Sequence, residues 1–245
     1  MEKFAFIPAR YQSSRFSGKP LTPIAGKPMI QHVYERAIAC HDLSDVYVAT
    51  DDERISDCVR EFGGKAIMTE KSHNSGTDRI AQAALMVGLE NDDIIVNIQG
   101  DQPVFDSAVI SQLIGPLEED TDISMTTLKC RIPDGSDFRN PNHVKVVTDT
   151  NGFALYFSRY PIPYFREYES SGVLYKHLGF YGFRMGFLLQ FTRLSEGVLE
   201  SAEKLEQLRA LENGFKIKVV ETSFDSVEVD VSEDVARVEE VLKRQ

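Results

Sequence analysis

Short apolar runs that alternate with helical stripes are the feature that most constrains how this chain can fold. Residues 4–7, 45–50 and 65–68 are mostly apolar and short enough to be buried strands. Between them, residues 28–39 and 55–62 carry apolar side chains at helical spacing. Because strand and helix alternate in this order, the strands need crossover connections and form a parallel sheet. The sequence therefore predicts an α/β fold.

The second half of the chain departs from this alternation. The patterns of residues 143–148 and 153–158, with a turn between them, predict a β-hairpin. A proline-containing loop and an acidic, aromatic stretch follow. We interpret this shift as a subdomain at about 132–175, inserted into a single domain of residues 1–245. There it would close the substrate side or contact another subunit.

Composition and charge narrow the classes of function. The 245 residues are 42% hydrophobic, enough for an ordinary globular core, and the net charge is −11. A protein that wraps nucleic acid usually has a net basic face, so we expect no nucleic-acid partner. The three cysteines are scattered without a CxxC pair, which favours reduced thiols over a disulfide framework or a zinc site. Without a long apolar run or a secretory leader, we predict a cytoplasmic protein with no membrane partner.

A basic loop follows the first predicted strand. In residues 7–21, IPARYQSSRFSGKPL, the cations Arg10, Arg15 and Lys19 lie four or five residues apart among Ser, Gly and Pro. Polyphosphate needs cations and backbone N–H groups that converge, and a Gly-rich or Pro-interrupted loop leaving a strand supplies both. The same residues could form an ordinary basic surface loop. The spacing of the three cations does not by itself distinguish a polyphosphate-binding loop from a surface loop.

A small polar loop, SGTDR, runs from Ser75 to Arg79 and leads into a predicted helix. Ser75 or Thr77 could simply cap that helix, and we expect capping by at least one of them. The functional alternative is a second ligand loop. Its N–H groups and hydroxyls would contact a base or a phosphate at the helix N-terminus.

The apolar run 94–98 predicts the central strand, which ends in the segment QGDQP. In open parallel sheets, ligands bind beyond the carboxyl ends of the strands. Asp101 therefore lies where a metal or a substrate would bind, and its carboxylate could hold Mg²⁺, a hard cation that prefers oxygen ligands. The alternative is an Asx-type turn residue before Pro103.

Three polar side chains stand out in the C-terminal part of the chain. His177 lies within a predicted strand at 175–184, where a lone histidine is more often structural than catalytic. We predict one helix over residues 202–213, with Glu203 facing solvent. Asp230 follows a short apolar segment that precedes the last predicted helix.

Together these motifs resemble one family along essentially the whole chain. In chain order they are IPARYQSSRFSGKPL, SGTDR, NIQGDQP, HVKVV, ALYFSR, HLGFYGFR, EKLEQLRAL and the terminal VEVD. One such motif would be a weak signal, but eight in register are highly specific. The chain resembles the 3-deoxy-manno-octulosonate cytidylyltransferase family, the CMP-Kdo synthetases.

The resemblance implies a fold and a reaction. The fold would be a Rossmann-like three-layer α/β/α arrangement of the nucleotide-diphospho-sugar transferase type. It would have a mostly parallel central sheet and an inserted β-rich region for dimerisation or closure. The reaction would convert CTP and Kdo into CMP-Kdo and pyrophosphate with Mg²⁺, for lipopolysaccharide synthesis in Gram-negative bacteria. Family members are usually homodimers, and we expect the contact around residues 139–171.

The resemblance also implies roles for individual residues. The family's triphosphate loop falls on Ala9, Arg10, Ser13, Ser14, Arg15 and Lys19. Its cytidine-side loop falls on Ser75, Gly76, Thr77 and Arg79, and its metal carboxylates fall on Asp101 and Asp230. Its sugar-acid contacts fall on Gln99, Arg159, His177, Tyr181, Glu206 and Gln207. The expected catalytic set is Arg15, Lys19, Asp101 and Asp230, and the fold must bring the two distant aspartates together.

Two positions depart from the family pattern. Ser17 stands where Pro is usual, which loosens a backbone restraint on the basic loop but keeps its cations. Lys176 stands where many members have Arg, on the sugar side. The acceptor is therefore Kdo or a close relative such as its 8-amino form. Alternatives are a cytidylyltransferase for another sugar acid, such as sialic acid, and a non-catalytic nucleotide-binding protein.

Overall fold

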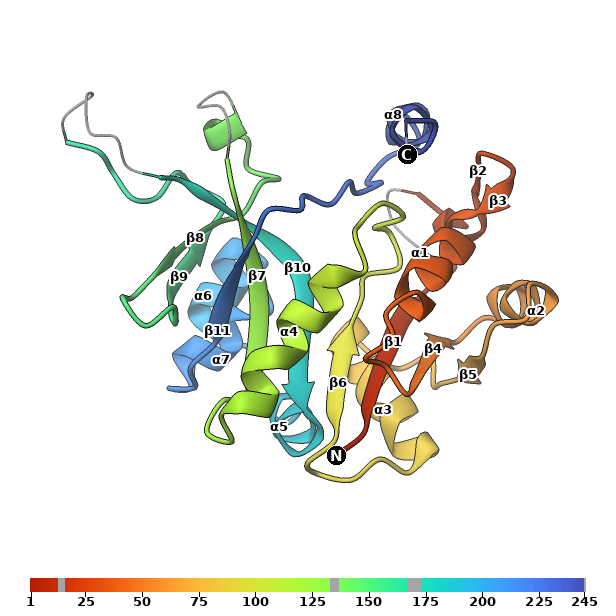
Figure 1. Cartoon of the computed structure of the whole chain (residues 1–245), viewed down its shortest axis with the longest axis horizontal. Helices are drawn as coiled ribbons and strands as arrows, with labels where there is room; N and C mark the ends of the chain where they lie inside the picture. The colour runs from red at the N-terminus through yellow and green to blue at the C-terminus, as the bar shows by residue number, and fades with distance from the viewer. Residues whose placement is uncertain (13–15, 133–136, 167–172, 245) are drawn as a thin grey trace.

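The computed structural model describes residues 1–12, 16–132, 137–166 and 173–244. Its centre is a sheet whose main path runs β11-β7-β10-β6-β1-β4-β5 (Figure 1). The strands are β1 (Lys3–Ala9), β4 (Asp45–Thr50), β5 (Ala66–Met68), β6 (Ile94–Asn97), β7 (Met125–Arg131), β10 (Tyr175–Arg184) and β11 (Lys218–Thr222). Strand β10 is antiparallel to β6 and β7, and the other pairs along this path are parallel. The predicted mostly parallel sheet is confirmed.

Helices cover both faces of the sheet, because successive strand side chains point to opposite sides. On one face, α1 (Met29–Ile38), α2 (Glu53–Glu61) and α4 (Ala108–Glu119) share an apolar core cluster with Ala5 and Ile7 of β1. On the other face, α3 (Gly76–Val87), α5 (Met185–Phe191) and α7 (Leu208–Glu212) share a second cluster with Phe6. This arrangement is the predicted three-layer α/β/α architecture. None of the helices within the described ranges is long and apolar enough to cross a membrane.

The predicted hairpin is formed by β8 (Lys145–Thr148) and β9 (Ala154–Ser158), which pair antiparallel. It joins the central sheet where Lys145 of β8 pairs with Lys176 of β10. The hairpin therefore extends the sheet at the start of β10 (Figure 1).

The single helix predicted over residues 202–213 is wrong. Helix α6 (Val198–Glu203) ends at Lys204, whose backbone is left-handed with φ 54°, and α7 begins only at Leu208. A helix cannot continue through a left-handed residue, so a turn separates the two segments. This turn carries Glu206 and Gln207, two of the predicted sugar contacts.

The C-terminal segment crosses from one edge of the sheet toward the other. After β11 the chain runs to α8 (Asp234–Leu242), which lies beside the small hairpin of β2 (Pro23–Ile24) and β3 (Lys27–Pro28) (Figure 1). Val238 of α8 shares an apolar cluster with Ile24 and Val229. The Ala25 amide also donates to the Glu239 carboxylate over 2.9 Å. These contacts fix the crossing segment over the carboxyl end of the sheet.

Candidate active site

The carboxyl ends of β1 and β6 enclose a cavity of about 340 Å³. Its lining residues are Pro8, Ala9, Arg10, Gln12, Lys19, Pro20, Met29, Gln99, Gly100 and Asp101. The Lys19 ammonium donates to the Asp101 carboxylate over 2.8 Å. At Gly100, an added Cβ would lie 2.8 Å from the Pro8 carbonyl oxygen, so only glycine lets the two strand ends approach this closely. Predicted nucleotide and sugar residues therefore meet in one cavity, with Asp101 at its edge.

The C-terminal segment brings the backbone next to Asp230 against Asp101. The Val229 amide donates to the Asp101 carbonyl over 2.9 Å. An antiparallel bridge between Val104 and Val227 extends the same contact. The residue before Asp230 in the chain is therefore tied directly to Asp101.

The two aspartates fit the way proteins bind magnesium. Mg²⁺ is usually held by one or two carboxylates together with substrate phosphates and water. Within the described ranges, no group of three or more His, Cys, Asp or Glu side chains is arranged to hold a metal ion by itself. Asp101 and Asp230 could therefore supply the protein's share of a magnesium site that phosphate oxygens complete.

Glu228 is a residue of this region that sequence reasoning missed. Part of the residue is exposed to solvent, but many protein atoms surround its carboxylate. This burial raises the pKa of Glu228, and the charges of Asp101 and Asp230 raise it further. The Gln102 amide donates to its carboxylate over 3.3 Å. The signal that could have found it is its position two residues before Asp230 in VEVD.

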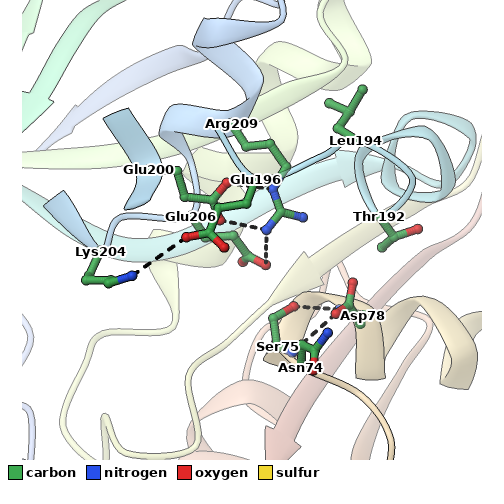
Figure 2. A pocket seen from close by; sticks show the side chains of 10 residues that line it. All are labelled: Asn74, Ser75, Asp78, Thr192, Leu194, Glu196, Glu200, Lys204, Glu206 and Arg209. Atoms are coloured by element: carbon green, nitrogen blue, oxygen red, sulfur yellow. Dashed lines mark hydrogen bonds and ion pairs between the residues drawn. The ribbon is translucent and has the colours of Figure 1, made fainter. Parts of the chain in front are cut away.

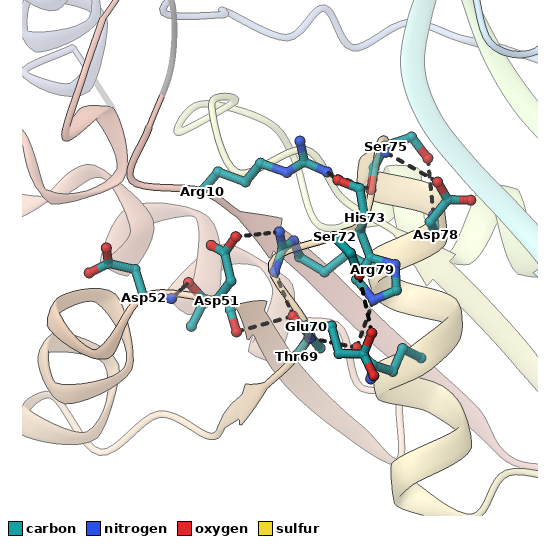
Figure 3. Close-up of polar contacts among 12 residues, drawn as sticks. Arg10, Asp51, Asp52, Thr69, Glu70, Ser72, His73, Ser75, Asp78 and Arg79 are labelled. Atoms are coloured by element: carbon teal, nitrogen blue, oxygen red, sulfur yellow. Dashed lines mark hydrogen bonds and ion pairs between the residues drawn. The ribbon is translucent and has the colours of Figure 1, made fainter.

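The predicted capping of α3 is confirmed. The Ser75 hydroxyl accepts from the Asp78 amide over 3.1 Å, and the Asp78 carboxylate accepts from the Ser75 amide over 3.2 Å. Arg10 reaches across from the first loop and donates to the carbonyls of His73 and Ser75 (Figure 3). At Gly76, an added Cβ would lie 3.1 Å from the Pro8 ring. The two predicted nucleotide loops therefore pack directly against each other.

Arg79 lies beneath the second loop and has no exposed surface. Its guanidinium donates to the Asp51 carboxylate over 2.9 Å and to the Thr69 hydroxyl (Figure 3). Burial lowers the pKa of Arg79, and the Asp51 carboxylate opposes that shift. In this position Arg79 joins the second loop to the side chains of Asp51 and Thr69, whereas a direct nucleotide contact would need an exposed guanidinium.

Glu206 joins the turn between α6 and α7 to the start of α3. Its carboxylate accepts from the Thr77 hydroxyl, and burial raises its pKa. A second cavity of about 530 Å³ lies beside this contact (Figure 2). Its lining residues are Asn74, Ser75, Asp78, Thr192, Leu194, Glu196, Glu200, Lys204, Glu206 and Arg209. Predicted cytidine and sugar residues thus also meet in this cavity.

His177 is buried in the sheet and packs against the rings of Phe157 and Tyr181. Its Nε2 lies 2.9 Å from the Thr127 hydroxyl oxygen, and that hydroxyl is 2.8 Å from the Phe180 carbonyl. In the tautomer with the proton on Nε2, the ring donates to Thr127 while the Thr127 hydroxyl donates its one hydrogen to the carbonyl. Burial lowers the pKa of His177 to about 3, so the ring is neutral at physiological pH.

Four buried polar atoms in β6, the loop after it and the turn between α6 and α7 have no hydrogen-bond partner among the described residues. They are Asn97 Oδ1, Gln102 Oε1, Glu206 Oε1 and Gln207 Nε2. Burial raises the pKa of Tyr181, helped by the charges of Glu206 and Glu228. Unpaired buried polar atoms are costly, so such a set is typical of a site that a polar ligand completes.

Arg159 is engaged with backbone carbonyls. Its guanidinium donates to the carbonyls of Glu203, Pro141 and Lys204 over 2.7, 3.1 and 3.4 Å. The prediction that Glu203 faces solvent is wrong, because its carboxylate accepts from the Ser158 hydroxyl over 2.7 Å and from the Arg159 amide over 2.8 Å. The end of α6 points these groups at the β8–β9 hairpin. A predicted sugar-acid contact, Arg159, therefore also fastens the hairpin to the turn that carries Glu206.

Three of the predicted triphosphate residues, Ser13, Ser14 and Arg15, lie outside the described residues. The remaining members of that set, Ala9, Arg10 and Lys19, line the first cavity together. The basic loop is thus tied to the sheet edge at both of its ends.

The chain is similar to known proteins along nearly its whole length. Residues 4–218 match the family described as cytidylyltransferase. The 3-deoxy-manno-octulosonate cytidylyltransferase of Syntrophus aciditrophicus (strain SB) is 55% identical over 243 residues, 99% of this chain and 98% of that protein. The 8-amino-3,8-dideoxy-manno-octulosonate cytidylyltransferase of Shewanella halifaxensis (strain HAW-EB4) is 55% identical over 230 residues, 94% of each chain. The solved structure of CMP:2-keto-3-deoxy-manno-octonic acid synthetase complexed with CTP has a TM-score of 0.93 and 40% identity, covering 100% of this chain and 99% of that chain.

Proposed function

This chain belongs to the cytidylyltransferase family, and we propose that it transfers the cytidylyl group of CTP to Kdo or its 8-amino relative. The observation that carries the proposal is the pairing of Asp101 with the segment of Asp230 beside Lys19. Lys19 bonds to the Asp101 carboxylate, and the residue before Asp230 bonds to the Asp101 carbonyl, at the carboxyl edge where open α/β sheets bind ligands. The two curated relatives name the two acceptors and are equally similar to this chain, so both remain within the proposal.

Transfer requires in-line attack on the α-phosphorus of CTP. The oxygen of the sugar's anomeric hydroxyl forms the new bond to phosphorus, the bond to the bridging oxygen of the β-phosphate breaks, and pyrophosphate leaves. The hydroxyl loses its proton to solvent water in this step. Phosphoryl chemistry of this kind depends mainly on positioning and charge neutralisation. In this chain, Lys19 and Arg10 would neutralise charge on the departing pyrophosphate, and Arg15 would join them.

Asp101 and Asp230 would hold Mg²⁺ in this proposal. Magnesium, when bound, would supply positive charge to the α-phosphate and bring the two substrates together. Lys19 lies within 2.8 Å of Asp101, so it balances the carboxylate charge before substrates bind. Glu228 adds a further carboxylate to this side of the site.

The sugar acid would bind against β10 and the turn between α6 and α7. Gln207 Nε2 and Glu206 Oε1, which have no hydrogen-bond partner among the described residues, would meet its hydroxyls, and Gln99 would join them from the first cavity. Neutral His177 would hold Tyr181 in place from within the sheet. Arg159 would bind the sugar carboxylate only by releasing at least one of its backbone carbonyls.

A second copy of this chain is the partner that we propose for the inserted region. Leu155, Tyr160 and Tyr164 are exposed there by 62%, 78% and 89%. Large apolar side chains gathered on one projection are typical of a subunit contact. We further expect a cytoplasmic enzyme that serves lipopolysaccharide synthesis.

Pyrophosphate release tests the proposed function. The protein is incubated with CTP, Mg²⁺ and, in separate reactions, Kdo, 8-amino-Kdo and sialic acid, and the CMP-sugar is identified by mass. Pyrophosphate and a CMP-sugar with Kdo or its amino form support the proposal. Turnover with sialic acid alone would assign another acceptor, and CTP binding without turnover would favour a nucleotide-binding protein.

A further inference from the structure

The acidic pair at the end of β4 has no part in the proposed reaction, yet it organises both nucleotide loops. Asp51 holds the buried Arg79 under the second loop, as described above (Figure 3). Asp52 starts α2, because its carboxylate accepts from the Arg54 amide over 3.1 Å. The same carboxylate takes two further bonds from the Arg54 guanidinium, over 2.8 and 2.7 Å. A bidentate pair of this kind fixes the plane and direction of the guanidinium.

The fixed guanidinium of Arg54 covers the ring of Tyr11. Its Cζ lies 3.3 Å from the ring centroid, a close cation–π contact. Tyr11 is the residue at which the basic loop leaves β1, and it also contacts the residue where the loop returns. The Gly18 amide donates to the Tyr11 carbonyl over 2.8 Å, and an added Cβ at Gly18 would lie 3.3 Å from the Tyr11 ring.

Gly18 in turn leads directly to Lys19, the cation that bonds to Asp101. Gly18 has φ 74°, and Lys19 follows it directly as the first residue of a short 3₁₀ helix. Lys19 then bonds to Asp101. A continuous series of contacts therefore runs from Arg54 through Tyr11 and Gly18 to Lys19. Moving the Tyr11 ring would move the backbone from which Lys19 extends.

We propose that Arg54 is a positioning residue for CTP, which acts through Tyr11 to hold Lys19 at the triphosphate. The inference rests on the proposed use of CTP. The alternative is that Arg54 forms an ordinary surface ion pair with Asp52, since exposed pairs contribute little. Arg54 touches neither cavity, so its effect on catalysis would reach CTP only through the loop.

Arg60 provides a matched control on the same helix. Its side chain is 61% exposed, compared with 58% for Arg54, and it pairs with Asp57 at 3.7 Å. For Arg54→Ala we expect KM for CTP to rise about three- to tenfold, the range of a cation–π contact. The kcat and the KM for the sugar acid should stay within about twofold. Arg60→Ala removes the same charge and should leave all three constants unchanged.

Substitutions of Tyr11 separate positioning from long-range charge. Tyr11→Phe keeps the ring and should behave like the wild type, and Arg54→Lys should recover part of the loss. Tyr11→Ala should raise KM for CTP as Arg54→Ala does, and the double variant should be no worse, because both changes break one contact. CTP binding measured by calorimetry without sugar should follow the same order, with melting temperatures close to that of Arg60→Ala.

Three results would overturn the inference. One is equal KM values for CTP in Arg54→Ala and Arg60→Ala. Another is a rise in both substrates' KM values that follows a loss of stability. The third is full additivity of the Arg54 and Tyr11 changes. If the wild-type protein neither binds CTP nor releases pyrophosphate, the proposed function has failed. If the wild type binds CTP and Arg54→Ala binds it equally well, only the inference about Arg54 has failed.

Discussion

The Val229 amide donates a hydrogen bond to the Asp101 carbonyl over 2.9 Å, and this contact joins two distant parts of the chain at the centre of the site. It aligns the C-terminal segment with the loop after β6. Asp230 follows Val229 directly, so both proposed metal carboxylates depend on this backbone pairing. Val229 is fully buried, which protects the hydrogen bond from water.

Replacing Asp101 with Asn should lower turnover by about 100-fold or more without unfolding the protein. The amide keeps the shape of the side chain but removes the charge that would hold Mg²⁺ and face Lys19. Pyrophosphate release measures turnover, and circular dichroism checks the fold. Asp57→Asn on the exposed side of α2 is the control. Near-normal turnover of Asp101→Asn would remove Asp101 from the proposed metal site.

Lys19→Met should lower kcat/KM for CTP by about 100-fold, because a cation that would face the leaving pyrophosphate is lost. Lys19→Arg keeps the charge with a different shape, so it should recover part of the activity. Steady-state kinetics with CTP as the varied substrate measure both variants. Equal kcat/KM values for Lys19→Met and the wild type would show that Lys19 has no role in the reaction.

Gly100→Ala should damage the site, whereas Gly115→Ala should not. The new Cβ at position 100 would lie 2.8 Å from the Pro8 carbonyl, so β1 and the loop that carries Asp101 must move apart. We expect a loss of kcat/KM of at least about tenfold. Gly115 lies within α4 with nothing within 4 Å of an added Cβ. Alanine there should stabilise the fold by about 0.5–1 kcal/mol, measured by urea unfolding.

His177 should make stability depend on pH in the acidic range. Its folded pKa is about 3, below the ordinary value of 6.5, so the unfolded state binds the proton more readily. The free energy of unfolding should therefore be unaffected by this group above about pH 6.5 and fall as the pH drops from there toward 3, by about 2 kcal/mol at pH 5. His177→Gln keeps an amide donor for Thr127 but cannot titrate. Urea unfolding of both proteins is measured from pH 8 to 5. The free energy of unfolding should fall less with decreasing pH in the variant than in the wild type, and an equal fall in both proteins would contradict this.

Local pattern was sufficient for much of the fold. The sequence predicted β6 and the position of Asp101 after it, because a buried parallel strand appears as a continuous apolar run. It also predicted a helix cap by Ser75 or Thr77, and Ser75 forms that cap with Asp78, three residues away. The hairpin of β8 and β9 followed from two apolar runs around a turn. In each case the residues that decide the structure are neighbours in the chain.

The predictions that failed depend on partners that are distant in sequence. Glu203 has the spacing of an exposed helical residue, but the hairpin brings Ser158 and Arg159 to its carboxylate. The break at Lys204 likewise escapes a reading of helical periodicity, since its neighbours are all good helix formers. Arg79 is a separate case, a residue whose burial the polar loop motif could not reveal, because its partners Asp51 and Thr69 are distant in the chain.

The sequence by itself determined the alternation of strands and helices in the first half of the chain, the α/β class, the family resemblance and the cations of the basic loop. Only the tertiary structure decided that Val229 pairs with Asp101, that Glu228 joins them and that Arg54 covers Tyr11. The physical reason is range. Apolar periodicity and capping act over a few residues, whereas a site at the edge of a parallel sheet is assembled from strand ends and a crossing segment that meet only after the chain has folded.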